Sequence, residues 1–173
     1  AVLIFSNFIG GFITDPEELT LQTPESFFAR FRIRARVRHE VLAIHPAEKT
    51  VTVRDLESGR VFDESYDKLI LSPGAKPVRP DLPGVEGERI FTLRTVEDTF
   101  RIHRFLEEQK PRSAAVVGGG FIGLEMAEEL REKGLEVTVI QRPAQVLNPL
   151  DADMAAFVHA GLRKRGVRLL TGR

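Results

Sequence analysis

The sequence predicts a mixed α/β fold of the three-layer type, in which a parallel βαβαβ unit follows an antiparallel β-meander. Two stretches of the chain carry this prediction. Residues 41–62 contain short runs of β-branched side chains separated by turn residues, which is typical of antiparallel hairpins. After Pro111, apolar runs alternate with amphipathic segments that end at glycine, which is typical of a parallel sheet with connecting helices.

The first expected elements are a short helix and a strand. Thr23, Pro24 and Glu25 form a helix start, with an N-cap, a first-turn proline and an acid that suits the helix dipole. From Arg32 to Arg38, arginines alternate with apolar side chains, and this period of two predicts a half-buried strand. The arginine row is interpreted as a solvated face, because alternation alone produces it.

The meander and a loop-rich crossing come next. Strands are expected at residues 41–44, 50–54 and 60–62, joined by turns at 45–49 and 57–59. The apolar run at 69–71 ends at Ser72-Pro73-Gly74, and prolines punctuate the chain as far as Gly87. A returning strand is expected at 90–93. Thr95, with Asp98 three residues later, predicts a capping box at the start of a helix.

The parallel unit begins after Pro111. Its predicted strands and helices alternate, and glycines 134 and 166 stop the two helices. Asp151 is expected to cap the second helix. The expected elements are a strand at 114–117, a helix at 121–133, a strand at 136–140, a helix at 152–165 and a strand at 167–170. This order is that of a Rossmann-like mononucleotide-binding half.

Gly118, Gly120 and Gly123 complete a G-x-G-x-x-G pattern between the first of these strands and the first helix, with Phe121 and Ile122 between the last two glycines. The first glycine permits a tight turn, the second lets a pyrophosphate approach the backbone, and the third lets the helix lie close to the strand. The helix N-terminus adds unpaired N–H groups. This setting predicts dinucleotide binding.

The end of the second strand indicates which nucleotide is accepted. Gln141 lies 18 residues after Gly123, where an NAD-binding domain commonly carries an acid that holds the ribose 2′-hydroxyl. Without that acid a 2′-phosphate is not repelled, and the neighbouring Arg142 is available to pair with it. The sequence therefore favours NADPH, and the alternative is that Arg142 is only a solvated loop charge.

Composition excludes several function classes. The chain has 25 basic and 25 acidic side chains, so its zero net charge favours neither nucleic acid nor an anionic membrane as a partner. The apolar stretch 1–13 is too short and too interrupted for a membrane span, and it lacks the basic flank of a signal peptide. The chain has no cysteine, so it supplies no disulfide or cysteine nucleophile. A cytoplasmic location is expected.

The histidines predict no metal site. None of the four pairs with another at metal-ligand spacing, and all are interpreted as structural or solvated. They are His39, His45, His103 and His159. We assign neither a metal ligand nor a catalytic residue in this chain.

Five segments together resemble one family. They are Ile9-Gly10-Gly11, Leu21 to Glu25, Tyr66 to Pro77, Thr92-Leu93-Arg94, and Gly118 to Glu125. From about Ile9 onward, the chain is similar to the flavin-dependent pyridine nucleotide-disulfide oxidoreductases, and within them to the coenzyme A-disulfide reductase and NADH oxidase/peroxidase branch. The resemblance implies FAD and NAD(P)H as small-molecule cofactors, and a homo-oligomer is expected.

The resemblance also implies cofactor contacts. The segment matching Ser72-Pro73-Gly74 passes against the FAD in such proteins, and backbone near Val41 contacts the adenine. The position of Glu125 lies close to the flavin and the nicotinamide. Phe121 falls where an aromatic residue often gates the nicotinamide pocket.

The chain also departs from the family pattern. The family's FAD domain begins with its own strand-glycine-helix unit, and its redox cysteine comes shortly before the segment matching Ile9-Gly10-Gly11. Neither is in this sequence, so we expect an internal fragment. Residues 1–109 are expected to be a partial FAD-binding domain with the β-meander and a connector, and residues 110–173 the N-terminal half of an NAD(P)-binding domain.

Three functions follow as hypotheses. The first is part of an FAD-dependent NAD(P)H oxidoreductase, in which hydride passes from nicotinamide to flavin and on to a disulfide or oxygen acceptor. The second is a nucleotide-binding or structural fragment without turnover. The third is a relative of the ferredoxin or rubredoxin reductases, which would need no cysteine.

Overall fold

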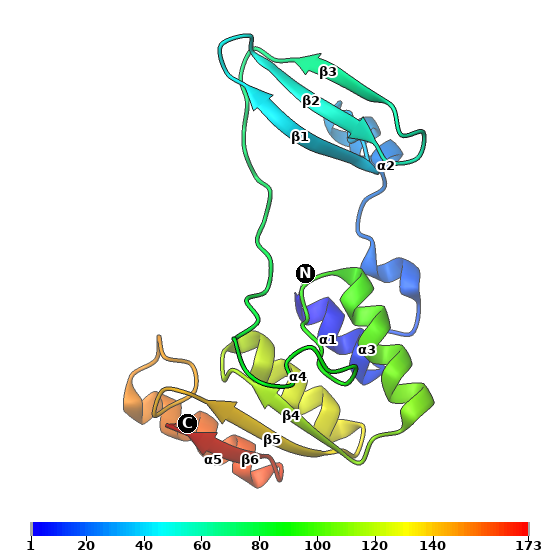
Figure 1. Ribbon diagram of the computed structural model, residues 1–173. Coiled ribbons are helices and arrows are strands. Elements are labelled where there is room, and N and C mark those ends of the chain that lie inside the picture. The colour runs from blue at the N-terminus through cyan, green and yellow to red at the C-terminus, as the bar shows by residue number, and fades with distance from the viewer. Residues whose placement is uncertain (1, 173) are drawn as a thin grey trace. The chain divides into compact units, whose positions relative to one another are not determined.

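The computed structural model describes residues 2–172, and it contains two compact units, each with a three-stranded sheet (Figure 1). Residues 20–75 form the first, here called the meander unit. Residues up to Leu19, together with those from Lys76 onward, form the second, here called the βαβ unit. Within residues 2–172, no helix has both the length and the apolar character that crossing a membrane requires.

The meander unit consists of one helix and an antiparallel sheet in the order β1-β2-β3. Thr23 begins the helix as predicted, because its hydroxyl accepts the Ser26 N–H at 3.2 Å while the Ser26 hydroxyl accepts the Thr23 N–H at 2.9 Å. Among the described residues of this unit, Val53 is the one buried apolar side chain. The elements are α2 (Pro24–Phe31), β1 (His39–His45), β2 (Thr50–Asp55) and β3 (Val61–Ser65).

The strand expected from Arg32 is not formed, and that prediction was wrong. Arg32 and Arg38 both have a φ of 58°, in the left-handed region, and β1 begins only at His39. Arg32 closes α2 by donating its N–H to the Phe28 carbonyl at 2.8 Å. A strand requires a neighbouring ladder as well as alternation. Every side chain from residue 32 to residue 38 is exposed, so burial did not favour a strand here.

The βαβ unit contains the predicted βαβαβ order, which the structure confirms. Its sheet is parallel, with β5 hydrogen-bonded to both β4 and β6. The helix after β4 buries Met126, Ala127 and Leu130, as its apolar spacing predicts. The elements are β4 (Ser113–Val117), α4 (Phe121–Glu132), β5 (Glu136–Gln141), α5 (Ala152–Lys164) and β6 (Arg168–Thr171). Asp151 occupies the N-cap position of α5 but makes no side-chain capping bond within the described residues.

Three further helices belong to the βαβ unit: α1 (Val2–Gly10), the 3₁₀ helix η1 (Pro16–Leu19) and α3 (Val96–Gln109). Helix α1 packs against α3 and α4 (Figure 1). The capping box of α3 is confirmed, because Asp98 accepts the Thr95 N–H at 3.1 Å and Thr95 accepts the Asp98 N–H at 3.2 Å.

The strand expected at residues 90–93 is absent, and that prediction was wrong. The segment is an irregular loop, and it contributes side chains rather than backbone pairing. Phe91 and Leu93 pack against the main core, and the Phe91 ring lies 5.0 Å from the Phe105 ring, centroid to centroid. Its apolar residues therefore serve the packing of α3 and not a sheet.

Candidate functional site

The candidate site is the glycine turn, residues 118–120, between β4 and α4. Gly118 has a φ of 110°, which favours glycine, and its N–H donates to the Ile140 carbonyl at 2.8 Å. Gly120 is the N-cap of α4, and its carbonyl accepts the Leu124 N–H at 3.0 Å. A Cβ at Gly123 would collide with the Gly118 carbonyl group. The first turn of α4 therefore lies directly against the glycine turn.

The middle glycine was not singled out by the sequence pattern, which treats it as a free position. The N–H of Gly119 donates to the Gln141 side-chain Oε1 at 2.8 Å, and its carbonyl accepts the Leu147 N–H at 2.8 Å. A Cβ at Gly119 would lie 2.7 Å from the Val146 Cγ1 atom. The only signal of this role in the sequence is the run of three consecutive glycines. The residues that contact Gly119 lie 22 or more positions later in the chain.

The outer side of the glycine turn is open. Apart from Gly120 and its two chain neighbours, no described residue has a heavy atom within 4 Å of the position that a Cβ at Gly120 would take. Large apolar side chains beside the turn are exposed: Val117 is 79% exposed, Phe121 65% and Ile122 41%. The first N–H groups of a helix have no partners within the helix and carry its positive dipole end. This arrangement suits an anionic group bound next to apolar surface.

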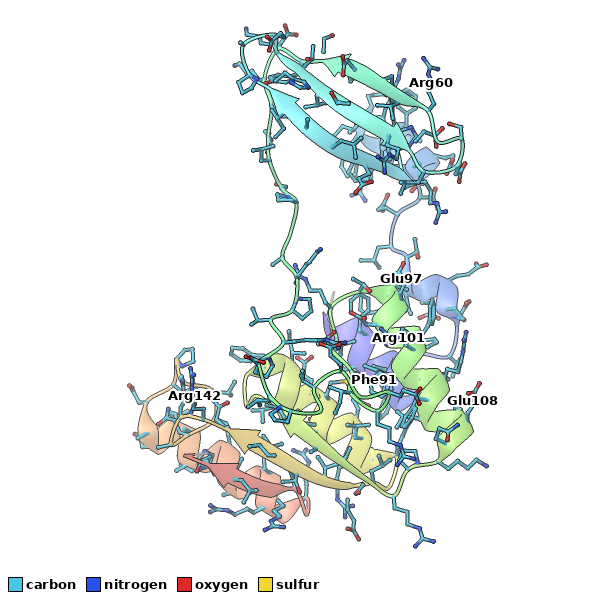
Figure 2. The ribbon with its side chains drawn as sticks, in the orientation of Figure 1. Arg60, Phe91, Glu97, Arg101, Glu108 and Arg142 are labelled. Carbon is cyan, nitrogen blue, oxygen red and sulfur yellow. The ribbon has the colours of Figure 1, made fainter. Side chains whose placement is uncertain are left out.

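Gln141 and Arg142, at the end of β5, lie beside the turn in different ways. The Gln141 carbonyl oxygen accepts the Gly119 N–H, and the N–H₂ group of the same amide makes no hydrogen bond to the described residues. Arg142 begins the loop that follows β5 (Figure 2); it is exposed and forms no ion pair with the described residues. Both side chains can therefore donate hydrogen bonds to a ligand.

Glu125 lies one helical turn after Phe121 on α4, and it is half-buried. Its Oε2 atom accepts a hydrogen bond of 3.4 Å from the Ser6 hydroxyl of α1, and Ser6 is fully buried. Helix α1 thus contacts the same helix that begins at the glycine turn. The sequence did not predict this contact, because the two residues are 119 positions apart.

Glu129, one turn further along α4, is buried against α1. Its Oε2 atom has no hydrogen-bond partner in the described residues, and its carboxyl occupies the space that a Cβ at Gly10 would need. Burial raises the pKa of Glu129 above its ordinary value, and the nearby acids Glu132, Glu128 and Glu125 raise it further. The fold therefore favours the protonated form of Glu129.

The candidate FAD contacts all lie in the meander unit. Val41 is 56% exposed and stands at a β-bulge, where the register of β1 against β2 shifts between Val41 and Ala43. Ser72, Pro73 and Gly74 are exposed in an irregular segment, and Gly74 has a φ of 72°. Their backbone is therefore accessible to a ligand.

Comparison with known proteins identifies the family. The profile of the family described as pyridine nucleotide-disulphide oxidoreductase matches residues 4–173. Coenzyme A disulfide reductase from Staphylococcus aureus is 39% identical over 159 residues, which is 92% of this chain and 36% of that protein. The chain therefore spans about a third of the length of the curated relatives it matches.

Two solved structures are similar over nearly the whole chain. The structure of reduced CoADR-RHD from Bacillus anthracis is 46% identical with a TM-score of 0.94, and the match covers 99% of this chain and 31% of that one. An engineered water-forming NADPH oxidase bound to NADPH is 33% identical with a TM-score of 0.84, and the match covers 97% and 37%. Its parent is the water-forming NADH oxidase from Lactobacillus brevis, solved with NADH.

These similarities confirm the resemblance that the motifs carried. Among the similar solved structures, one is an FAD-dependent pyridine nucleotide-disulphide oxidoreductase from Desulfovibrio vulgaris, one is bound to NADPH and one is bound to NADH. With the profile match over residues 4–173, the chain belongs to the pyridine nucleotide-disulphide oxidoreductase family.

Proposed function

We propose that this chain is part of an FAD-dependent NAD(P)H oxidoreductase that passes hydride from nicotinamide to flavin and on to a disulfide or oxygen acceptor. The observation that carries the proposal is the glycine turn, which is open at Gly120 and closed by backbone at Gly123. A bound pyrophosphate must approach the backbone closely at the position of Gly120, and the helix must pack tightly against the strand at the position of Gly123. The family membership supports the same function.

The residues present fit a dinucleotide. The open backbone at Gly120 and the N-terminus of α4 would hold the pyrophosphate, while the exposed Phe121 ring would cover the nicotinamide. Gly118, Ile122 and Gly123 shape the turn around it. The bound nucleotide supplies the hydride, and the protein aligns it. Glu125, held by Ser6, would face the reacting end.

The FAD would contact the meander unit. In this proposal the backbone near Val41 contacts the adenine, and the segment Ser72-Pro73-Gly74 passes against the FAD. All of these residues are exposed. In this proposal, residues 1–109 are the partial FAD-binding domain, and residues 110–173 are the first half of the NAD(P)-binding domain. These boundaries describe cofactor binding, whereas the compact units of the fold divide the chain at residues 20 and 76.

NADPH is the nucleotide that the donors at the end of β5 favour. Gln141 presents its N–H₂ group and Arg142 its guanidinium, and both are suited to phosphate oxygens. The engineered NADPH oxidase differs from its NADH-using parent by five substitutions, which include aspartate to alanine and, at the next position, alanine to arginine. The loss of an acid beside a new arginine parallels the pair seen here.

The proposed setting is a cytoplasmic homo-oligomer with small-molecule partners and without nucleic acid or membrane. Zero net charge supports the absence of a polyanionic partner. A sedimentation experiment on the chain, with and without FAD, would show the oligomeric state.

Titration calorimetry with NADH and NADPH tests the proposed function. We expect binding of both nucleotides, with NADPH bound more tightly, and a yellow flavin spectrum only when FAD is added to the complete oxidoreductase. A folded chain that binds neither nucleotide would contradict the proposal.

A further inference from the structure

We propose that His159 is a positioning residue for the nucleotide site, which it serves by holding the β5–α5 loop, residues 142–150, against the glycine turn. The inference rests on the proposed binding of NAD(P)H at that turn. It concerns a side chain on α5 that neither the glycine pattern nor the family resemblance assigned. The observation behind it is a hydrogen bond from the Val146 N–H to the His159 Nε2 atom, 3.2 Å long.

The loop and the turn are joined at one residue, Gly119. The Leu147 N–H donates to the Gly119 carbonyl at 2.8 Å, and the Val146 side chain fills the space that any side chain at Gly119 would need. Val146 is fully buried and Leu147 is 8% exposed. Because Gly119 precedes Gly120, the loop fixes the backbone on which the pyrophosphate would rest.

The conformation that makes this contact is a strained one. Leu147 has a φ of 48°, in the left-handed region, which is unfavourable for a residue other than glycine. Such a conformation persists only where neighbouring bonds hold it. The Val146 N–H immediately before it is held by His159, and the Gln145 amide donates to the Leu150 carbonyl at 2.8 Å.

His159 acts in this contact as an acceptor. A backbone N–H can only donate, so the Nε2 atom must carry a lone pair and the ring must be neutral with its proton on Nδ1. The ring is half-buried, and it reaches the loop from the middle of α5. An apolar side chain at 159 would leave the Val146 N–H of this partly buried bond without its partner.

The same loop begins with Arg142, the proposed reader of a 2′-phosphate. If the loop leaves the turn part of the time, only the molecules with a docked loop can bind the nucleotide. The apparent affinity is then the intrinsic affinity multiplied by the fraction of docked molecules. Loss of the hydrogen bond to His159 would shift the equilibrium between the docked and the undocked loop about three- to tenfold toward the undocked form. We therefore expect both nucleotides to bind more weakly when position 159 has no acceptor, because both use the turn.

The first experiment measures dissociation constants for NADH and NADPH by calorimetry. His159→Leu and His159→Ala remove the acceptor, while His159→Gln provides an amide oxygen at similar reach. His39→Gln, a change of the same kind in the meander unit, is the matched control. We expect both nucleotides to bind more weakly in the Leu and Ala variants, by at most about tenfold, with recovery in the Gln variant and no change in the control.

The outcomes separate the inference from the proposed function. Wild-type affinity in folded Leu and Ala variants would overturn the role of His159, as would a Gln variant that binds as weakly as they do. Binding of neither nucleotide by the wild type would instead overturn the proposed function. Amide hydrogen exchange tests the loop itself without a nucleotide: faster exchange at Val146 and Leu147 in the Leu variant supports the inference, and unchanged exchange overturns it.

Discussion

Gly120 and Gly123 belong to one motif, yet the structure predicts opposite consequences for the same substitution. At Gly120 the backbone has a φ of −83°, and apart from the two chain neighbours no described residue has a heavy atom within 4 Å of an added Cβ. Alanine is a poorer N-cap than glycine but restricts the unfolded chain more, and these effects are each about 0.5–1 kcal/mol with opposite sign. Gly120→Ala should therefore fold with nearly unchanged stability.

At Gly123 the added Cβ would meet the backbone of Gly118, with the carbonyl carbon at 3.1 Å. Backbone cannot rotate away as a side chain can, so α4 must shift. Overpacking of this kind costs about 1–3 kcal/mol, against a gain of roughly 0.5–1 kcal/mol from replacing glycine in a helix. We expect Gly123→Ala to lose up to about 2.5 kcal/mol of unfolding free energy.

Nucleotide binding then separates the two roles. The methyl group of Gly120→Ala lies where the pyrophosphate approaches, so calorimetry should show at least about a tenfold loss of affinity in a stable protein. Gly161→Ala, in the middle of α5 with no described atom near its Cβ position, is the control and should bind normally. Normal NAD(P)H affinity in Gly120→Ala would refute the placement of a pyrophosphate against this turn.

Three further predictions concern charge and packing. Burial raises the pKa of Glu129 in the folded chain, so this carboxyl ionises at a lower pH in the unfolded chain than in the folded one. The free energy of unfolding therefore falls as the pH rises from the unfolded pKa toward the folded pKa. Glu129→Gln should therefore raise the melting temperature at about pH 8 and leave it nearly unchanged at about pH 4; equal effects at both would contradict a protonated carboxyl. Arg142→Ala should weaken NADPH binding by about 1–3 kcal/mol at low salt, less as salt rises, and spare NADH, whereas Gln141→Glu should favour NADH. Equal losses for both nucleotides in Arg142→Ala would show that the arginine does not read the 2′-phosphate. With one buried apolar side chain, residues 39–65 should exchange their amides faster than β4 to β6, and uniformly slow exchange would count against a loosely packed meander unit.

Local chemistry explains which elements the sequence predicted well. The capping box of Thr95 and Asp98 is complete within four residues, and it placed the start of α3 correctly. The segment from Arg32 to Arg38 has the alternation of a strand but no neighbour with which to pair, so periodicity alone misled. Pairing is a tertiary property that a single segment does not encode.

The candidate site shows the same division. The spacing of Gly118, Gly120 and Gly123 identified the turn, because each glycine answers a constraint within the strand-turn-helix segment itself. The role of Gly119 depends on Val146, and that of Val146 on His159. Each of these links crosses from one element to the next, so only the folded chain brings them together.

The division of the chain into units has a consequence for the order in which it folds. Helix α1 precedes α4 in the chain, and its contact between Ser6 and Glu125 spans 119 residues, so that contact forms only after α4 is present. The intervening residues 20–75 form a unit of their own, with local hairpins that close early. Joining the ends of a flexible 56-residue segment costs about 3.6 kcal/mol by loop-closure entropy, and a preformed meander removes most of that freedom. Local folding of residues 20–75 therefore lowers the entropy that is lost when the contact between α1 and α4 forms.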